Sequence, residues 1–257
     1  MHKTSMTKQL VRKMLHPVRL AARRFLMLPS DEKAYIGPHG CIRTAAQFVT
    51  WNQVPGDYFE FGVYRGDTFA AAYHTLCGLR KKHRSRGFLG ESDSPDFQKW
   101  LNDRPRFVAF DSFEGLPPSA GDRHVDYKVG AFACSEEDFR RNIAQQNVDL
   151  NDVITVKGFY DKTLNEETKK KHGLSKVAVA MIDCDLYEST VPVLNFLTDL
   201  VQQGTILIFD DWFRFRGSPN QGEQRAFREW QERNPHLQMI EYWREGPQAV
   251  SFLVNFR

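Results

Sequence analysis

The sequence predicts an α/β fold of three layers, in which helices cover both faces of a mostly parallel sheet of seven strands. Short apolar runs rich in β-branched and aromatic residues alternate with segments of helical period along most of the chain. The 257 residues, 41% of them hydrophobic and 26% charged, suffice for one large domain with a continuous core. Gly246-Pro247 separates the last two apolar runs as a turn would, so we expect an antiparallel hairpin at the C-terminus.

Each element of this fold follows from a run in the sequence. The strands are expected at 57–62, 106–111, 152–157, 177–183, 204–210, 238–244 and 248–256, and the helices at 66–81, 135–146, 161–171, 189–201 and 222–233. Ser135 is expected to cap its helix, because three acids follow it where the helix dipole favours negative charge. Residues 83–105 are rich in polar residues and Gly, and predict a polar surface insertion before the second strand.

Residues 1–30 predict a basic amphipathic arm in front of a domain that occupies residues 31–257. The arm holds seven Lys and Arg and no acid, whereas the net charge of the whole chain is only +3. Apolar residues recur between these cations at helical spacing. The arm is therefore expected to pack on its own domain or on a second subunit of a homo-oligomer, or to contact an anionic membrane surface.

The composition also argues against several classes of protein. No apolar run approaches the roughly 18 residues that a membrane-spanning helix needs. The four cysteines form no C-x-x-C pair, so neither a zinc site nor a disulfide framework is indicated. A cytoplasmic location is expected, either free or at the inner face of the membrane. No nucleic-acid partner is expected, because the chain beyond the arm is net acidic and the basic stretch at 80–84 is interpreted as a solvated face.

The first predicted strand leads into a loop that is typical of nucleotide sites. Glu60 lies in the strand, and Gly62 allows the turn to pass close beneath a ligand. Gly66 leaves the N-terminus of the next helix open to that ligand. Asp111 ends the neighbouring strand, where a carboxylate suits the hydroxyls of a ribose. The chain has no G-x-G-x-x-G, which disfavours a pyrophosphate, so a nucleoside without phosphate such as S-adenosylmethionine fits.

The fourth and fifth predicted strands end in four carboxylates, Asp183, Asp185, Asp210 and Asp211. At one edge of a sheet they would repel one another, so either some stay protonated or a hard cation such as Mg²⁺ lies among them. Capping of the following helices would explain Asp185 and Asp211 singly, but it explains the two pairs poorly.

Five segments together resemble the macrocin O-methyltransferase-like enzymes, which are class I S-adenosylmethionine-dependent methyltransferases with a Rossmann-like fold. They are FEFGVYRG from residue 59, FDSFEGLPP from residue 110, KGFYDKTL from residue 157, MIDCDLYEST from residue 181, and the DDW that follows GTILI. The resemblance implies Mg²⁺-dependent O-methylation, with sugar hydroxyls of macrolides or related glycosides as the acceptors of the known members.

The resemblance also implies roles for individual residues. It places the cofactor at Glu60, Gly62, Tyr64, Arg65, Gly66, Asp111, Ser112, Gly158, Phe159 and Asp183, and the metal at Asp183, Asp210 and Asp211, with Asp185 behind the metal. The family has a histidine near the substrate, for which His124 is the nearest candidate, so the catalytic base is expected to be Asp183 or His124. Apart from the resemblance, Trp212, Phe213 and Phe215 are expected to offer an apolar platform for a sugar face. Arg214 and Arg216 beside them would favour an acidic or phosphorylated saccharide, as in a surface-polysaccharide precursor.

Two other functions stay open at this point. Asp183-Cys184-Asp185 also matches the D-x-D of a metal-dependent glycosyltransferase, although the loop at 59–66 argues against that enzyme. A non-catalytic nucleoside-binding or assembly protein, tethered by its basic arm, is disfavoured by the intact acids.

Overall fold

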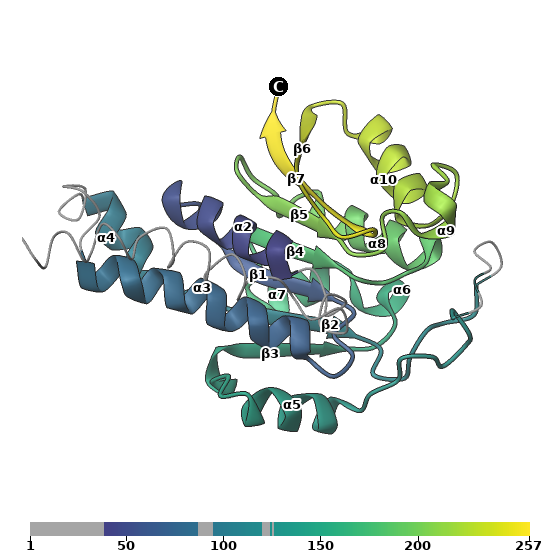
Figure 1. Cartoon of the computed structure of the whole chain (residues 1–257), viewed down its shortest axis with the longest axis horizontal. Coiled ribbons are helices and arrows are strands. Elements are labelled where there is room, and N and C mark those ends of the chain that lie inside the picture. Colours follow the sequence, from purple (N-terminus) through teal and green to yellow (C-terminus); the bar gives the residue numbers. More distant parts are fainter. Residues whose placement is uncertain (1–38, 87–94, 120–123, 125) are drawn as a thin grey trace, which may run out of the picture. The chain divides into compact units, whose positions relative to one another are not determined.

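In the computed structural model of this chain, residues 39–86, 95–119, 124 and 126–257 are described. The predicted arm at 1–30 lies outside these residues. The described strands form a seven-stranded sheet in the order β3-β2-β1-β4-β5-β7-β6 (Figure 1). They are β1 (Asp57–Phe61), β2 (Phe107–Asp111), β3 (Val153–Lys157), β4 (Val177–Ile182), β5 (Ile206–Phe209), β6 (Leu237–Glu245) and β7 (Ala249–Phe256).

The sheet is parallel except at its C-terminal side, which confirms the predicted pattern. β1 pairs in parallel with β2 and β4, while β3 extends the sheet beyond β2 and β5 extends it beyond β4. β7 is antiparallel to both β5 and β6, and the chain reverses between β6 and β7 at Gly246 and Pro247. The chain runs outward from β1 to β3 and then returns to β4. Such a reversal leaves a crevice at the carboxyl ends of the strands, where ligands bind in open α/β sheets.

Helices cover both faces of the sheet and complete the three predicted layers (Figure 1). They are α2 (His39–Trp51), α3 (Asp67–Arg86), α4 (Pro95–Asn102), α5 (Glu136–Gln145), α6 (Tyr160–Thr163), α7 (Glu166–His172), α8 (Tyr187–Leu197), α9 (Arg214–Gly217) and α10 (Gly222–Arg233), with a 3₁₀ turn at Leu150–Asp152. Ser135 caps α5 as predicted, since its side chain accepts the backbone N–H of Asp138 at 3.1 Å.

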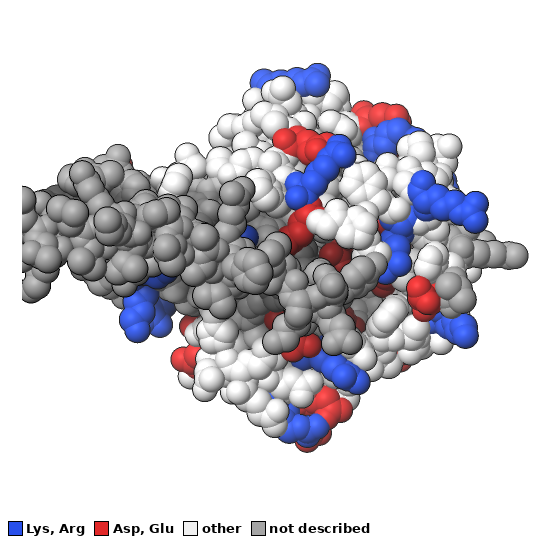
Figure 2. Space-filling view, in the orientation of Figure 1, with Lys and Arg blue, Asp and Glu red and all other residues white. Residues whose placement is uncertain are grey.

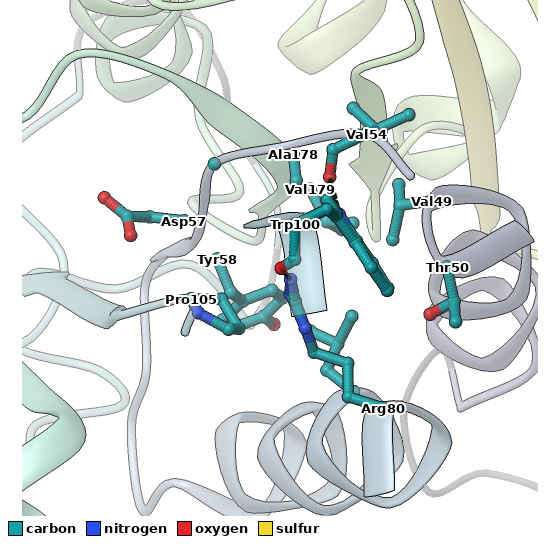
Figure 3. A pocket seen from close by; sticks show the side chains of 12 residues that line it. Val49, Thr50, Val54, Asp57, Tyr58, Arg80, Trp100, Pro105, Ala178 and Val179 are labelled. Atoms are coloured by element: carbon teal, nitrogen blue, oxygen red, sulfur yellow. Dashed lines mark hydrogen bonds between the residues drawn. The ribbon is translucent and has the colours of Figure 1, made fainter. Parts of the chain in front are cut away.

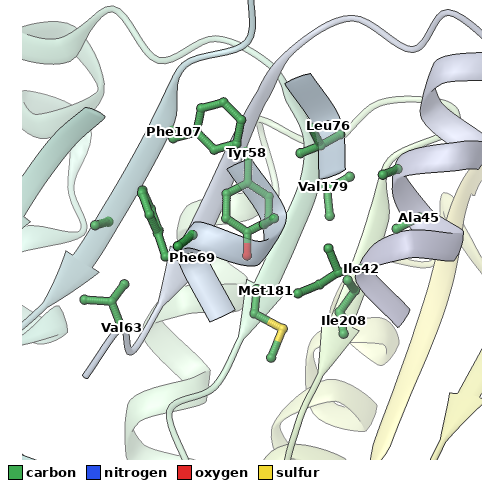
Figure 4. Packing of buried hydrophobic residues seen from close by; sticks show 14 of the residues in the cluster. Ile42, Ala45, Tyr58, Val63, Phe69, Leu76, Phe107, Val179, Met181 and Ile208 are labelled. Carbon is green, nitrogen blue, oxygen red and sulfur yellow. The ribbon is translucent and has the colours of Figure 1, made fainter. Parts of the chain in front are cut away.

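Two apolar cores hold these layers together. Tyr58 of β1 points into the core beneath α2, α3 and α5, where it meets Phe69 (Figure 4). The next residue, Phe59, points into the opposite core beneath α8 and α10, which includes Trp230. Successive side chains of a strand point to opposite faces. Because helices cover both faces, β4 and β5 are buried along their whole length and read as continuous apolar runs.

The helices depart from the predicted ones in two places. The sequence predicted one helix at 161–171, but α6 and α7 are separate. Asn165 caps a new helix, α7, because its side chain accepts the backbone N–H of Thr168 at 2.9 Å. The helix α2 was not predicted, although Ile42, Ala45 and Val49 carry the apolar period that buries one face of it.

The segment expected to be a polar insertion at 83–105 contains a second unpredicted helix, α4. Its buried face consists of Phe97, Trp100 and Leu101. The Trp100 indole donates to the carbonyl of Val54 at 3.1 Å, and the Arg80 guanidinium lies 3.8 Å from the Trp100 ring. The side chains of Trp100, Arg80 and Val54 line a small cavity at the amino ends of β1 and β4 (Figure 3). Two helical turns give too short a period to separate this helix from the polar residues around it.

Charged side chains of both signs are interspersed over the described part of the face in Figure 2. None of the helices in the described ranges combines the length and the hydropathy that crossing a membrane requires.

Candidate active site

The carboxyl ends of β1, β4 and β5 meet at one edge of the sheet. Gly62, Asp183 and Asp210 each donate their backbone N–H to the neighbouring strand, at 2.9, 2.9 and 3.1 Å, and so continue the parallel ladders past the strand ends. These bonds fix the three residues at one level of the edge. The predicted glycine loop and the predicted acids therefore lie side by side where the order of the strands reverses.

The loop after β1 is held against the end of β4. Gly62 has a φ of +88°, and a β-carbon at this position would collide with the backbone carbonyl of Asp183, so only glycine fits. The N–H of Gly66 donates to the carbonyl of Val63 at 2.7 Å and closes the loop. Tyr64 and Arg65 between them are exposed, with the Arg65 guanidinium 5.1 Å from the centre of the Tyr64 ring.

Asp111 connects the loops that surround this edge. One of its carboxylate oxygens accepts the N–H groups of Val63 at 2.8 Å and Tyr64 at 3.3 Å, and the other accepts that of Phe113 at 2.7 Å. Its backbone carbonyl accepts the N–H of Gly158 at 2.9 Å. A carboxylate oxygen can accept two hydrogen bonds. The oxygen bonded to Phe113 therefore keeps capacity for one further donor.

Three other predicted cofactor residues have contacts within the protein. The buried hydroxyl of Ser112 donates to the carbonyl of Gly115 at 2.9 Å. Phe159 lies at the start of α6, directly after Gly158. Glu60 is buried and accepts a hydrogen bond from the Tyr58 hydroxyl. Burial raises the pKa of Glu60 to about 8, although this hydrogen bond acts in the opposite direction.

A group of three acids lies next to this loop. Asp183, Asp185 and Asp211 bring carboxylate oxygens within 4.8 Å of one another, and we call these residues the acid cluster. Burial raises the pKa of Asp183 and of Asp185 well above the usual range, and the charges of Asp210 and Asp211 raise these values further. Burial and the charge of Asp211 also raise the pKa of Asp210, to about 7. Glu223 adds another buried carboxylate, which accepts the N–H of Asp211 at 3.1 Å.

The acid cluster differs in one residue from the expected metal ligands. Asp185, which the resemblance placed behind the metal, belongs to the cluster, whereas Asp210 is not one of its three members. Asp185 has a φ of +62°, a left-handed conformation that costs roughly 1 kcal/mol. Mg²⁺ is a hard cation that takes oxygen ligands, including carboxylates, and a cation would relieve the repulsion that contributes to these raised pKa values. The residues present therefore fit a divalent cation.

Two side chains outside the acid cluster face its carboxylates. The Nε of Arg214 lies 2.8 Å from Oδ1 of Asp211. The Tyr127 hydroxyl faces Asp185 and lowers the pKa of that carboxyl, without the geometry of a full hydrogen bond. Burial, then the charges of Asp211 and Asp185, raise the pKa of Tyr127, so its hydroxyl stays protonated. The sequence did not identify Tyr127, because it lies in an irregular segment with no motif or apolar period.

His124 is near this group, but its described contacts are to other residues. Its ring centre is 4.9 Å from that of Tyr127 and 6.1 Å from that of Phe215. Its Nδ1 lies 3.4 Å from a carboxylate oxygen of Asp126. The structure thus brings His124 to the aromatic rings beside the acid cluster, and its role as a base stays a prediction.

The expected aromatic platform at 212–216 is wrong for Trp212. Its ring packs on Phe209, Phe227 and Phe252 at 4.9–5.2 Å, inside the core beneath α10. The side chain follows the buried face of β5 rather than the ligand edge. Phe215 is the member of this run that reaches the rings of His124 and Tyr127.

Comparisons with known proteins show which family and which solved structures this chain is similar to. A family model described as macrocin O-methyltransferase matches residues 96–245, which is more than half of the chain. The chain is 34% identical over 180 residues to demethyldecarbamoylnovobiocin O-methyltransferase of Streptomyces niveus, across 66% of this chain and 58% of that protein. It is 28% identical over 179 residues to 8-demethyl-8-(2,3-dimethoxy-alpha-L-rhamnosyl)-tetracenomycin-C 4'-O-methyltransferase of Streptomyces olivaceus, across 67% of this chain and 57% of that protein.

The chain therefore spans less than two thirds of the length of either relative. Among solved structures, that of the O-methyltransferase NovP superposes with a TM-score of 0.60 at 25% identity, over 84% of this chain and 78% of that chain.

Proposed function

Because the chain belongs to the macrocin O-methyltransferase family, we propose that it transfers a methyl group from S-adenosylmethionine to a hydroxyl of a sugar or glycoside, with Mg²⁺ at the acid cluster. One observation carries the proposal. Asp183, Asp185 and Asp211 approach one another within 4.8 Å directly beside the glycine loop after β1. A methyl donor and a metal-held acceptor would meet at that place.

The cofactor would lie across the ends of β1, β2 and β3. The loop with Gly62 and Gly66 would pass beneath it, and Tyr64 and Arg65 would be free to close over it. Asp111 would accept a ribose hydroxyl with its remaining capacity. S-adenosylmethionine, when bound, supplies an electrophilic methyl group on a sulfonium.

Asp183, Asp185 and Asp211 would hold the metal ion, with Asp210 as a further ligand. The chemistry that the ion would supply there is Lewis acidity, which would lower the pKa of an acceptor hydroxyl beside these carboxylates. Asp183, which lies in the acid cluster, would accept the proton of the reacting hydroxyl. His124 is the second candidate for this base. The methyl group would pass from the sulfonium sulfur to the acceptor oxygen, and the loop with Gly62 and Gly66 would then release S-adenosylhomocysteine.

Three observations support a sugar acceptor. The name of the Streptomyces olivaceus relative specifies a rhamnosyl group as the site of methylation. The rings of His124, Tyr127 and Phe215 lie within 6.1 Å of one another and could pack against the C–H face of a sugar. Three carboxylates around one cation also suit the chelation of neighbouring hydroxyls.

A panel of acceptors tests this proposal. The full chain is incubated with labelled S-adenosylmethionine, Mg²⁺ and one of three acceptors, a nitrophenyl rhamnoside, a nitrophenyl glucuronide or a catechol. We expect methylation of at least one glycoside. Turnover of the catechol alone would contradict the sugar acceptor but not the methyl transfer. Calorimetric binding of a UDP-sugar in the absence of any binding of S-adenosylhomocysteine would indicate a glycosyltransferase instead.

A further inference from the structure

Tyr127 faces the acid cluster from a segment to which no motif assigns a function. Its hydroxyl oxygen is buried and has no hydrogen-bond partner among the described residues. A buried hydroxyl without a partner costs about 1–3 kcal/mol, so such groups are rare and call for an explanation. Among the described residues, the charged groups that act on this hydroxyl include the carboxylates of Asp211 and Asp185 and the guanidinium of Arg214.

The ring of Tyr127 is held in place by its neighbours. His124 and Phe215 contact it at centroid distances of 4.9 and 5.8 Å, and the Arg214 guanidinium lies 6.0 Å from its centre. Phe215 has a strained φ of +55°. A β-carbon on Gly222 would lie only 2.7 Å from the Phe215 ring, so the glycine at the start of α10 makes room for that ring. The hydroxyl of Tyr127 is thereby kept beside the acids.

Tyr127 and Arg214 face different members of the acid cluster. Arg214 forms its ion pair with Asp211 at 2.8 Å, whereas Tyr127 faces Asp185. An ionised carboxylate accepts hydrogen bonds but donates none, so its orientation depends on donors of this kind. In metal sites such outer donors orient the ligands, and their loss typically lowers metal affinity by about 10- to 100-fold.

We propose that Tyr127 is a positioning residue of the metal site. Its hydroxyl, which has no partner among the described residues, would donate to Asp185 when a cation is bound and keep that carboxylate turned toward Asp183 and Asp211. The inference rests on the proposed function, because it assumes a divalent cation at the acid cluster. A phenol orients Asp185 without a positive charge, so the carboxylate keeps its full negative charge for the cation. Arg214 would hold Asp211 from the other side, through a charged contact.

Metal binding provides a test that does not depend on turnover. Mn²⁺ is titrated into the full metal-free chain and followed by electron paramagnetic resonance. Tyr127→Phe keeps the ring and removes the hydroxyl, and we expect it to weaken Mn²⁺ binding by about 10- to 100-fold. Tyr73→Phe is the matched control, because its hydroxyl donates to Asp152 at 3.1 Å, a carboxylate outside the acid cluster. This control and the binding of S-adenosylhomocysteine in both variants are expected to be unchanged.

A double-mutant cycle shows whether Tyr127 acts through Asp185. In an Asp185→Asn background we expect Tyr127→Phe to cause no further loss of Mn²⁺ affinity, because the carboxylate that it orients is gone. Affinity of Tyr127→Phe within about twofold of the wild type would overturn the inference, as would an equal loss in both backgrounds. Wild-type protein that binds no Mn²⁺ would refute the metal site itself, and with it the metal-dependent part of the proposed function.

Discussion

The backbone carbonyl of Asp183 lies where a β-carbon at position 62 would be, so among the amino acids only glycine fits at position 62. Gly62 belongs to the loop that would hold the cofactor, and Asp183 belongs to the acid cluster. Direct packing of the two backbones therefore sets the distance between the proposed methyl donor and the proposed metal. A change at either residue is expected to disturb both sites.

Gly62→Ala tests this contact. The variant is expected to lower the free energy of unfolding by more than about 1 kcal/mol, because both the φ of +88° and the Asp183 carbonyl oppose a β-carbon. Gly78→Ala in α3 is the control, since no atom lies within 4 Å of its β-carbon and alanine favours a helix by about 0.5–1 kcal/mol. Urea denaturation measures both values. A Gly62→Ala protein as stable as the wild type would show that the contact can relax.

Asp111→Ala is expected to weaken the binding of S-adenosylhomocysteine. Loss of one charge-assisted hydrogen bond costs about 1.5–3 kcal/mol, which is roughly 10- to 150-fold in affinity. The loop after β1 also loses its bonds from Val63 and Tyr64, which acts in the same direction. Asp111→Asn keeps an acceptor oxygen and is expected to lose less. Calorimetry with the same affinity in all three proteins would remove Asp111 from the cofactor site.

The metal-free protein is expected to lose stability as the pH rises. The pKa of Glu60 is raised to about 8 and that of Asp210 to about 7, so both bind a proton in the folded chain after the unfolded chain has released it. Each contributes stability that is complete at low pH and is lost as the pH rises through the folded pKa, by about 1.4 kcal/mol per pH unit and proton. Urea denaturation in EDTA between about pH 5 and pH 8.5 measures this slope, and Glu60→Gln should make it shallower. A free energy of unfolding that rises across this range would contradict the assigned pKa shifts.

Trp100→Ala is expected to destabilise the protein by about 3–5 kcal/mol, the usual loss for a large aromatic side chain of a core. Trp100 is 6% exposed and packs on Arg80 at the amino ends of the strands, away from the acid cluster. Trp51→Ala is the matched control, because Trp51 is 64% exposed and its loss should change stability by no more than about 0.5 kcal/mol. Thermal denaturation distinguishes the two. Equal effects would mean that α4 does not contribute to the core.

The features that the sequence predicted depend on local patterns. The strands β4 and β5 were predictable because burial on both faces makes each one a continuous apolar run, and Gly246-Pro247 marked the hairpin. The acids were predictable because Asp183 and Asp210 directly follow such runs, so their strands had to deliver them to one edge.

The features that the sequence did not predict depend on contacts between distant segments. Tyr127 meets Phe215 and Asp185 only after the chain has folded, and nothing in its own segment indicates that contact. Trp212 follows the acids directly, yet packing against Phe227 and Phe252 draws it into the core. Asp185, which belongs to the acid cluster where Asp210 was expected, has a left-handed φ of +62° that no motif records.

The most direct test of the account is the rate of methyl transfer to a glycoside with and without metal. Protein stripped with EDTA is assayed with labelled S-adenosylmethionine and the nitrophenyl glycoside that it methylates best, before and after addition of Mg²⁺, beside Asp211→Asn as the matched variant. We expect no turnover in EDTA, full recovery with Mg²⁺ in the wild type, and no recovery in the variant. Full turnover by the metal-free wild type would contradict a metal-dependent methyltransferase at the acid cluster.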